Sequence, residues 1–437
     1  MPSTRVQARW LATSLRTGAW NRAGIADRLT RALPAAGVDS GQLAARLAFH
    51  FEGPGPPAFE PLVDYLLDEP LLQPAFAEGA ATRLLVDSPP WGAPADRPVT
   101  FPLPELATHG DVGQWLGLRG DELAWFADSR QRQASCTRSE LHHYRYAWTR
   151  KRSGGLRLIE APKSRLKAIQ RRILTDILNR VPPHPAAHGF TRGRSTLSYA
   201  SPHVGQRGVL RLDLQDFFHS VPIARVGAVF RRLGYPFGAA STLQGLCANS
   251  VSPVLAGPRF RDLTWSERKR LQSPHLAQGA PTSPALANLC AWRLDCRLEG
   301  LAAHHHLQYT RYADDLAFSG PTLSVGLARF LAALVGAIAA EEGFAVNHRK
   351  TRVQRASQRQ SLAGVVINRK PNTVREDYDR LRATLHNCAR HGPASQNRDG
   401  HPDFEAHLRG RVSHVARMNP ARATKLHELW IRIDWSR

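Results

Sequence analysis

Three aspartates in apolar segments are the residues best suited to chemistry, and the first, Asp213, lies in the β-rich run GVLRLDLQDFF (208–218). Asp314 and Asp315 lie at the centre of LQYTRYADDLAFSG (307–320), whose alternating pattern predicts a hairpin. Carboxylates in apolar strands repel one another unless a cation gathers them, and Mg²⁺ prefers such oxygen ligands. Two Mg²⁺ ions about 3.5–4 Å apart would clamp the attacking and leaving oxygens of a phosphoryl transfer. The alternative is that one acid is solvated at the turn while another caps a helix.

The distribution of charge along the chain indicates a polyanionic partner. The 437 residues carry 59 Lys and Arg against 36 Asp and Glu, a formal net charge of +23. Residues 1–130 hold 11 basic and 15 acidic side chains, so the positive charge lies in the remainder of the chain. A basic body behind an acidic leader favours a nucleic acid that the body alone binds. Since 52 of the 59 cations are Arg, the alternative interpretation is the compositional drift of a GC-rich genome.

The rest of the composition excludes several classes of protein. The chain is 42% hydrophobic, enough for a core, and its first 20 residues lack the apolar stretch of a secretory signal. The most apolar window, 323–340, is interrupted by Arg329 and predicts a buried amphipathic helix rather than a membrane span. Five scattered cysteines without a C-x-x-C pair indicate reduced thiols and argue against a zinc site, and the run His304–His306 predicts a polar loop. We therefore expect a cytoplasmic protein that has no membrane partner.

The elements that must position the aspartates mix strands and helices without a regular repeat. LRLIEAP (156–162) and LAGVVIN (362–368) predict strands, while residues 164–181 and 283–302 carry helical spacing. The sequence contains neither a G-x-G-x-x-G nor a G-K-[ST] loop, which excludes a simple dinucleotide-binding or P-loop fold. These patterns favour the α+β class.

Breaks rich in Pro and Gly divide the chain into regions. The segments 53–57 and 88–104 separate a mostly helical N-terminal extension over residues 1–105. Residues 106–136 predict a helical lead-in of two short helices, and the main body begins at residue 137.

Eight short motifs in a fixed order give the main body a family resemblance. They are SGGLRLIEAP, LKAIQ, AHGFTRGRS, LDLQDFF, QGAPTSPALANL, YADD, GFAVNHRKT and LAGVVIN. In this order and spacing they resemble the bacterial reverse transcriptases of the retron and group II intron kind, over about residues 137–437. The resemblance implies a right-hand polymerase fold, with fingers and palm over 137–368 and a thumb over 369–437. It also implies RNA-templated DNA synthesis that requires Mg²⁺.

The resemblance implies roles for the acids first. Asp213 and Asp314 would bridge two Mg²⁺ ions, with the Leu214 carbonyl beside them, and Mn²⁺ would serve as a substitute. Asp315 would orient the site and tune its charge more than hold both ions. The metal pair would lower the pKa of the primer hydroxyl and neutralise the triphosphate, so no side-chain nucleophile is required.

A deoxynucleotide site around these acids follows from the same resemblance. Phe218 would lie under the sugar and clash with a 2′-hydroxyl, and Gln278 would abut the incoming nucleotide. Asp216 would contact the triphosphate through its backbone. Arg157 would bind the triphosphate bidentately, and Lys151 is a weaker candidate for this contact. The alternatives are a core position for Phe218 and a merely solvated face for the cations.

Further cations are implied at the leaving group and along the nucleic acid. Lys350, in GFAVNHRKT, would lie near the pyrophosphate, either as a general acid or as a screen for phosphate charge. A Gly-flexed loop beside Phe190 suits a template backbone with base stacking, and the basic C-terminal helices suit the product duplex. The cations expected at template and duplex are Lys163, Arg165, Arg192, Arg194, Arg409 and Arg411.

Two motifs depart from the common retron pattern. The chain has YASPH (199–203) where retrons commonly show N-A-x-x-H, and Leu362-Ala363-Gly364 where they show V-T-G. Because of the second departure, two priming groups are considered, which are the 3′ hydroxyl of a primer and a 2′ hydroxyl of RNA. The short 200–207 spacing and the absence of a maturase or nuclease segment after the thumb favour a retron-related enzyme over an intron enzyme.

The implied partners are an RNA template, expected to be a structured non-coding RNA, the DNA product and dNTPs. An effector protein is expected at the N-terminal region, and antiphage defence is the role implied by analogy. The alternative functions are a DNA-templated or template-independent polymerase of a defence system, and a catalytically silent RNA-binding scaffold.

Overall fold

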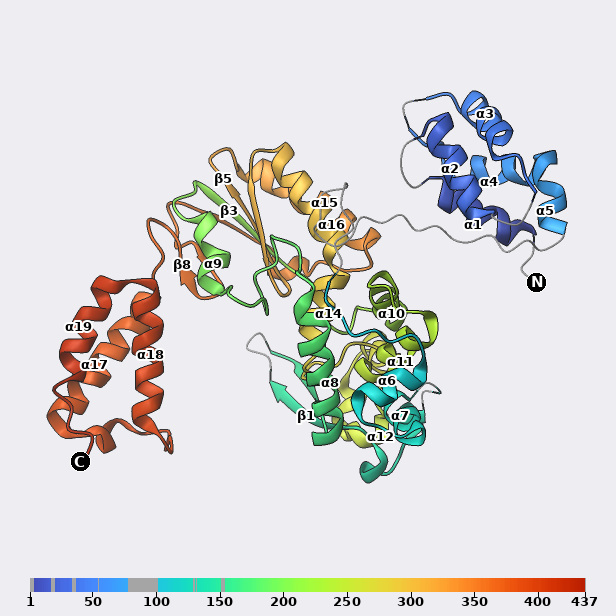
Figure 1. Cartoon of the computed structure of the whole chain (residues 1–437). Coiled ribbons are helices and arrows are strands. Elements are labelled where there is room, and N and C mark those ends of the chain that lie inside the picture. Colours follow the sequence, from blue (N-terminus) through green and yellow to red (C-terminus); the bar gives the residue numbers. More distant parts are fainter. Residues whose placement is uncertain are drawn as a thin grey trace. The chain divides into compact units, whose positions relative to one another are not determined.

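The computed structural model describes most of the chain, which folds as the units Met1–Val99 and Thr100–Arg437 (Figure 1). The described residues are 4–16, 20–33, 37–53, 55–77, 101–128, 130, 132–150 and 154–436. Among them no helix is long and apolar enough to cross a bilayer, and the five cysteines are free thiols. Lys151, a predicted triphosphate contact, lies outside the described residues.

The first unit is a small group of helices around its own core. These helices are α1 (Thr4–Leu15), α2 (Arg22–Ala32), α3 (Ser40–His50), α4 (Phe59–Asp68), η1 (Pro70–Leu72) and α5 (Gln73–Ala77). Helix α2 begins where the Asn21 side chain accepts a hydrogen bond from the Gly24 amide, and Asp39 caps α3 in the same way. Leucines at helical spacing, such as Leu11 and Leu15, are completely buried in the shared core.

A four-stranded antiparallel sheet forms the centre of the second unit. Its strands are β3 (Gly208–Asp213), β4 (Gln308–Tyr312), β5 (Asp315–Gly320) and β6 (Arg352–Arg355), in the order β4-β5-β3-β6. Strands β4 and β5 form the hairpin that the alternation over 307–320 predicted. Strand β3 is almost completely buried, since helix α9 (Thr196–Ala200) packs on Val209 and helix α16 (Val325–Glu341) also contacts the strand.

Helices covering the sheet follow the predicted apolar pattern with one interruption. Helix α16 confirms the amphipathic helix predicted over 323–340, with Leu331 and Val335 buried and Phe330 exposed. The helix predicted over 283–302 is divided at Ala291 into α14 (Ser283–Cys290) and α15 (Trp292–His304). Helix α15 takes in the first residue of the His304–His306 run, and the other two follow it.

A second hairpin lies apart from the central sheet in the topology. Strand β1 (Tyr144–Arg150) pairs antiparallel with β2 (Leu156–Pro162), which confirms the strand predicted there. The helix predicted over 164–181 ends earlier, as α8 (Ser164–Asp176) followed by η4 (Leu178–Arg180). The strand predicted over 362–368 is instead the tight hairpin of β7 (Ser361–Leu362) and β8 (Val365–Val366). Positive φ angles of 45° at Ala363 and 84° at Gly364 close this turn, so a single long strand is excluded.

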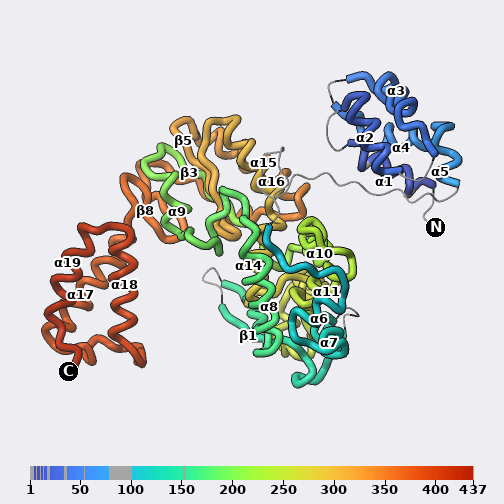
Figure 2. Tube along the Cα trace, viewed as in Figure 1, coloured from blue at the N-terminus to red at the C-terminus, as the bar shows by residue number. Residues whose placement is uncertain are grey.

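The remaining elements of the second unit are short or lie near its C-terminus. They are α6 (His109–Leu116), α7 (Gly120–Ala127), η2 (Arg132–Ser135), η3 (Ser139–Leu141), η5 (Ser201–His203), α10 (Ile223–Arg232), α11 (Phe237–Cys247), α12 (Pro253–Ala256), η6 (Pro258–Asp262), α13 (Trp265–Gln272), η7 (His348–Lys350), α17 (Arg375–His391), η8 (Pro393–Gln396), α18 (Phe404–Met418) and α19 (Pro420–Trp430). Helices α6 and α7 are the two short helices predicted in the lead-in. Helices α17, α18 and α19 lie side by side in the C-terminal part of the trace (Figure 2) and share a core that includes Leu385, Val412 and Leu426.

Candidate active site

The end of the central sheet gathers the three predicted aspartates. Asp213 is the last residue of β3 and pairs in register with Asp315, the first residue of β5. Asp314 lies in the turn before it, where Ala313 has a φ of +54° and the Leu214 amide donates to the Asp314 carbonyl at 2.8 Å. Because β3 ends and β5 begins at the same edge of the sheet, the three carboxylates lie at one end of one sheet. We call them the aspartate cluster.

Cations balance only part of the charge of the aspartate cluster. The Lys350 ammonium lies 2.9 Å from both carboxylate oxygens of Asp213, and the Arg211 guanidinium donates to Asp315 Oδ1 at 2.7 and 3.0 Å. Burial, followed by the charges of Asp315 and Asp213, raises the pKa of Asp314 to about 6. Burial also raises the pKa of Asp315, although Arg211 opposes this shift. A divalent cation would relieve the remaining repulsion, so this oxygen donor set fits a hard metal ion.

A buried arginine supports the turn that carries Asp314. Arg311 is completely buried and donates to both carboxylate oxygens of Asp295, from Nε at 2.7 Å and from Nη2 at 2.6 Å. Its Nη1 also donates to the Ala313 carbonyl at 3.1 Å and to Asn288 Oδ1 at 2.9 Å. The Asn288 amide in turn donates to the Gly189 carbonyl at 2.8 Å. This network fixes the backbone of the turn that carries Asp314 against the segment before Phe190.

Close backbone packing explains the glycine in that segment. A Cβ atom on Gly189 would lie 2.5 Å from the Ala313 amide nitrogen, a distance that no side chain tolerates. The neighbouring His188 amide donates to the Arg311 carbonyl at 2.7 Å, which extends the sheet beyond β4 by one bridge. The HGF motif is therefore a backbone support for the turn.

The histidine of YASPH has a structural position. His203 is completely buried, with Nδ1 at 2.6 Å from Ser319 Oγ and Nε2 at 2.8 Å from Thr310 Oγ1. Burial lowers the pKa of His203 to about 3, so the ring is neutral at physiological pH. Its contacts join η5 to both strands of the β4–β5 hairpin.

A cavity of about 400 Å³ opens beside the aspartate cluster. Its lining includes four of the residues predicted to contact the nucleotide, which are Arg157, Asp216, Phe218 and Gln278. Asp213, Asp314 and Lys350 also line it, so the acids and the cations face one space. Carboxylates, guanidinium and ammonium groups around a cavity of this size suit a nucleoside triphosphate with bound cations.

One further cation in the cavity escaped the sequence analysis. Arg270 of α13 lines the cavity, and its Nη1 lies 3.1 Å from the Asp216 carboxylate. Asp216 has a φ of +48°, which marks the tight turn between β3 and Phe218. The Phe218 ring packs 5.6 Å from Phe217 and 6.1 Å from Phe190, so it is part of an aromatic group at the cavity wall. Because α13 lies outside the recognised motifs, no pattern in the sequence singled Arg270 out.

The segment around Gln278 is held against β2 by backbone contacts. The Glu160 amide donates to the Gln278 carbonyl at 2.9 Å. Gly279 has a φ of +137°, and a Cβ there would lie 2.9 Å from the Glu160 carbonyl oxygen. Only glycine permits this approach, which explains the Gln-Gly pair of the motif.

The outer cations predicted to bind nucleic acid lie away from the aspartate cluster, and several have protein partners. Lys163 Nζ donates to the carbonyls of Ser139 and Glu140. Arg165 forms an ion pair with Glu122, and its guanidinium lies 5.4 Å from the centre of the Phe126 ring.

Arg192 and Arg194 lie in the Gly-flexed loop beside Phe190, and Arg409 and Arg411 lie on α18. Arg194 donates to the Pro185 carbonyl, whereas exposed Arg192 lines a separate cavity of about 220 Å³. Arg409 pairs with Glu405 on its own helix, and Arg411 is half-buried.

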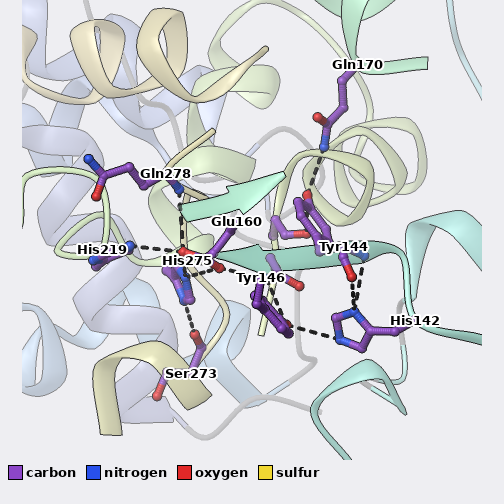
Figure 3. Close-up of polar contacts among 11 residues, drawn as sticks. His142, Tyr144, Tyr146, Glu160, Gln170, His219, Ser273, His275 and Gln278 are labelled. Atoms are coloured by element: carbon purple, nitrogen blue, oxygen red, sulfur yellow. Dashed lines mark hydrogen bonds and ion pairs between the residues drawn. The ribbon is translucent and has the colours of Figure 1, made fainter. Parts of the chain in front are cut away.

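A second group of ionisable side chains lies next to the cavity and was missed by the sequence analysis. Glu160 of β2, His219 and His275 place a ligand atom each within 4.8 Å of one another, a group that could hold a metal ion (Figure 3). We call these three residues the Glu160 cluster. A signal for it existed, because Glu160 is a carboxylate within the predicted strand 156–162, and a carboxylate within an apolar strand is also what singled out Asp213.

Comparison with known proteins agrees with this site. Residues 149–368 match the family "Reverse transcriptase (RNA-dependent DNA polymerase)". The chain is 42% identical over 336 residues to the retron Mx65 reverse transcriptase of Myxococcus xanthus, which covers 75% of this chain and 72% of the relative. The chain belongs to the retron-type reverse transcriptases.

Two further retron enzymes resemble the chain at lower sequence identity. The retron Mx162 reverse transcriptase of Myxococcus xanthus is 35% identical over 340 residues, covering 73% of this chain and 66% of its own. The retron Ec86 reverse transcriptase of Escherichia coli is 34% identical over 234 residues, covering 53% of this chain and 65% of its own. This retron-type enzyme is thus an RNA-directed DNA polymerase with a polymerase fold, and the prediction from motif order is confirmed. Its template is RNA, its product is DNA, and its family uses divalent metal ions.

Proposed function

We propose that Asp213 and Asp314 hold two Mg²⁺ ions for nucleotidyl transfer, with the Leu214 carbonyl beside them and Asp315 tuning the charge. One observation carries the proposal, namely three carboxylates at one end of a sheet beside a cavity lined with cations. Bound Mg²⁺ would supply activation of the primer hydroxyl and neutralisation of the triphosphate. Mn²⁺ suits the same oxygen donors and would substitute for Mg²⁺.

The cavity residues would select and orient the incoming dNTP. Phe218 excludes a 2′-hydroxyl by its bulk, and Gln278 abuts the nucleotide. Arg157 binds the triphosphate through its guanidinium, and the Asp216 backbone contributes a further contact. Lys350 donates a proton from Nζ to the pyrophosphate or screens its charge. Lys151 is an additional candidate for the triphosphate.

The nucleic acid would extend from this cavity along the outer cations. The template would contact Lys163, Arg165, Arg192 and Arg194, and the product duplex would contact Arg409 and Arg411 of the thumb. Lys163 and Arg165 would then exchange some of their protein contacts for phosphate. The fingers, palm and thumb would correspond to residues 137–368 and 369–437.

The RNA copied would be a structured non-coding RNA, because the relatives are enzymes of retrons. The priming group is a primer 3′ or an RNA 2′ hydroxyl. A cytoplasmic role in antiphage defence, with an effector protein bound by the acidic N-terminal unit, fits the separation of charge along the chain.

The experiment is primer extension on poly(rA)/oligo(dT) with Asp314→Asn, using Asp262→Asn as a matched exposed control. We expect Asp314→Asn to abolish dTTP incorporation while its circular dichroism spectrum stays unchanged, and Asp262→Asn to retain the wild-type rate. Undiminished synthesis by Asp314→Asn would refute the assignment. Incorporation that persists without template, or prefers poly(dA), would favour a template-independent or DNA-templated polymerase instead.

A further inference from the structure

We propose that Glu160 is a positioning residue that sets deoxynucleotide selectivity, because its buried carboxylate joins the turn after Phe218 and the Gln278 segment to β2. The inference rests on the proposed function, in which Phe218 and Gln278 contact the nucleotide. Glu160 itself does not line the cavity, so it would act through these neighbours.

The contacts of Glu160 saturate its carboxylate. The side chain is completely buried and accepts hydrogen bonds from His219 Nε2 at 3.0 Å, His275 Nε2 at 3.1 Å and Asn249 Nδ2 at 2.7 Å. The Gln278 amide lies 3.5 Å from Oε1, at the limit of a hydrogen bond. These donors come from separate segments of the chain, and Figure 3 shows His219, His275 and Gln278 converging on the one carboxylate.

The partners of His275 determine its charge. Its Nδ1 lies 2.7 Å from the Ser273 carbonyl, and its Nε2 faces the Glu160 carboxylate. Both partners are acceptors only, so both ring nitrogens carry a proton and the ring is a buried imidazolium. Burial lowers the pKa of His275, but the charge and hydrogen bond of Glu160 outweigh it and raise the pKa above its usual value. Burial disfavours the charged form of Glu160 too and so raises its pKa. The charges and hydrogen bonds of His275 and His219 outweigh burial and hold the pKa of Glu160 below its usual value.

An ion pair is favoured over a metal ion at this cluster. A metal ion would require His275 Nε2 to lose its proton and would compete with the Asn249 amide for the carboxylate. A buried ion pair is a poor source of stability compared with apolar packing, because desolvation offsets much of its attraction. Its value here is the geometry that it imposes on the segments it joins.

The segments joined by Glu160 are those that shape the sugar side of the cavity. His219 directly follows Phe218 and itself lines the cavity, so its bond to Glu160 limits how far the Phe218 ring can withdraw. The backbone pairing of Glu160 with Gln278 sets the opposite wall, and Arg157 precedes Glu160 on the same strand. Discrimination between two similar substrates depends on the position of the residues that contact them, so loosening this anchor should weaken dATP binding and relax selectivity.

The experiment compares dATP with ATP on poly(rU)/oligo(dA) for Glu160→Gln, with Glu299→Gln as the matched control. Glu299 is an exposed carboxylate 3.6 Å from His184 and lies outside the cavity lining. For Glu160→Gln we expect the KM for dATP to rise about tenfold, kcat to change less than about threefold, and the dATP preference to fall about tenfold. Glu299→Gln should leave all three unchanged.

A second variant tests the same inference if Glu160→Gln fails to fold. His219→Phe keeps a ring but removes the donor to Glu160, while the pair of Glu160 and His275 stays intact. We expect a smaller loss of dATP preference in the same direction. If both variants fold and keep the wild-type preference for dATP over ATP, the proposal is overturned. It is also overturned if the purified wild-type enzyme contains stoichiometric zinc and both variants lack that zinc. Loss of synthesis in Asp314→Asn is scored separately, so failure of the metal assignment is distinguishable from failure of this inference.

Discussion

The aspartate cluster and the Glu160 cluster both place carboxylates in apolar strands of the same unit, but their surroundings differ. Both carboxylate oxygens of Glu160 accept hydrogen bonds from side chains of other segments, and the pKa of Glu160 lies below its usual value. In the aspartate cluster, burial and mutual repulsion raise the pKa of Asp314 to about 6 even though Lys350 lies nearby.

This difference separates a carboxylate that fixes geometry from one that is prepared for a ligand. A buried charge with matched donors has no further need of a cation and resists displacement. A group of acids that repel one another gains from a cation, and here Asp213 and Asp314 also line a cavity from which one could enter. Burial alone therefore does not single out a candidate catalytic acid, whereas burial with incomplete neutralisation does.

The largest expected difference between the clusters is in the chemical step. Asp213→Asn should lower kcat for dNTP incorporation by about 10³-fold or more, because it removes a carboxylate that we propose holds the metal ions. Single-turnover primer extension measures this rate, with Asp377→Asn as an exposed control on α17. A loss of kcat of less than about tenfold would mean that Asp213 takes no part in the chemical step. Its role would then not differ from that of Glu160.

A smaller effect of Glu160→Gln is expected on folding stability. The substitution leaves the buried His275 cation without its counter-charge, so the free energy of unfolding should fall by about 2–3 kcal/mol. Urea denaturation of the purified enzyme at pH 7 measures this value. Unchanged stability would mean that the pair is not charged in the folded protein.

Asp314→Asn should change stability least and in the opposite direction. A raised pKa means that the folded state binds a proton more tightly than the unfolded state, so stability falls as pH rises from about 4 through about 6. Without divalent metal at pH 7, the neutral amide should therefore raise the free energy of unfolding by on the order of 1 kcal/mol. Thermal melting at pH 7 and pH 4 in EDTA tests this, and the gain should vanish at pH 4. A destabilised variant at pH 7 would show that the aspartate cluster is already neutralised.

Local patterns were sufficient for the parts of the molecule that depend on neighbouring residues. Alternation predicted the β4–β5 hairpin, the segment LRLIEAP was predicted as the strand that is β2, and the apolar window interrupted by Arg329 predicted α16. The strand predicted over 362–368 failed because the left-handed turn at Ala363 divides it, and hydrophobic periodicity carries no signal for φ at an alanine. The break at Ala291 was missed for a similar reason, since an apolar helical pattern continues across it.

The sequence by itself determined the family, the order of the motifs and the identity of the three aspartates, because these features lie in short segments with strong local constraints. Only the tertiary structure decided which other charges matter. Glu160 meets His275 across 115 positions of the chain, and Arg311 meets Asp295 only through the packing of β4 on α15. Burial, protonation and pairing are properties of contacts between distant segments, and these contacts exist only once the chain has folded.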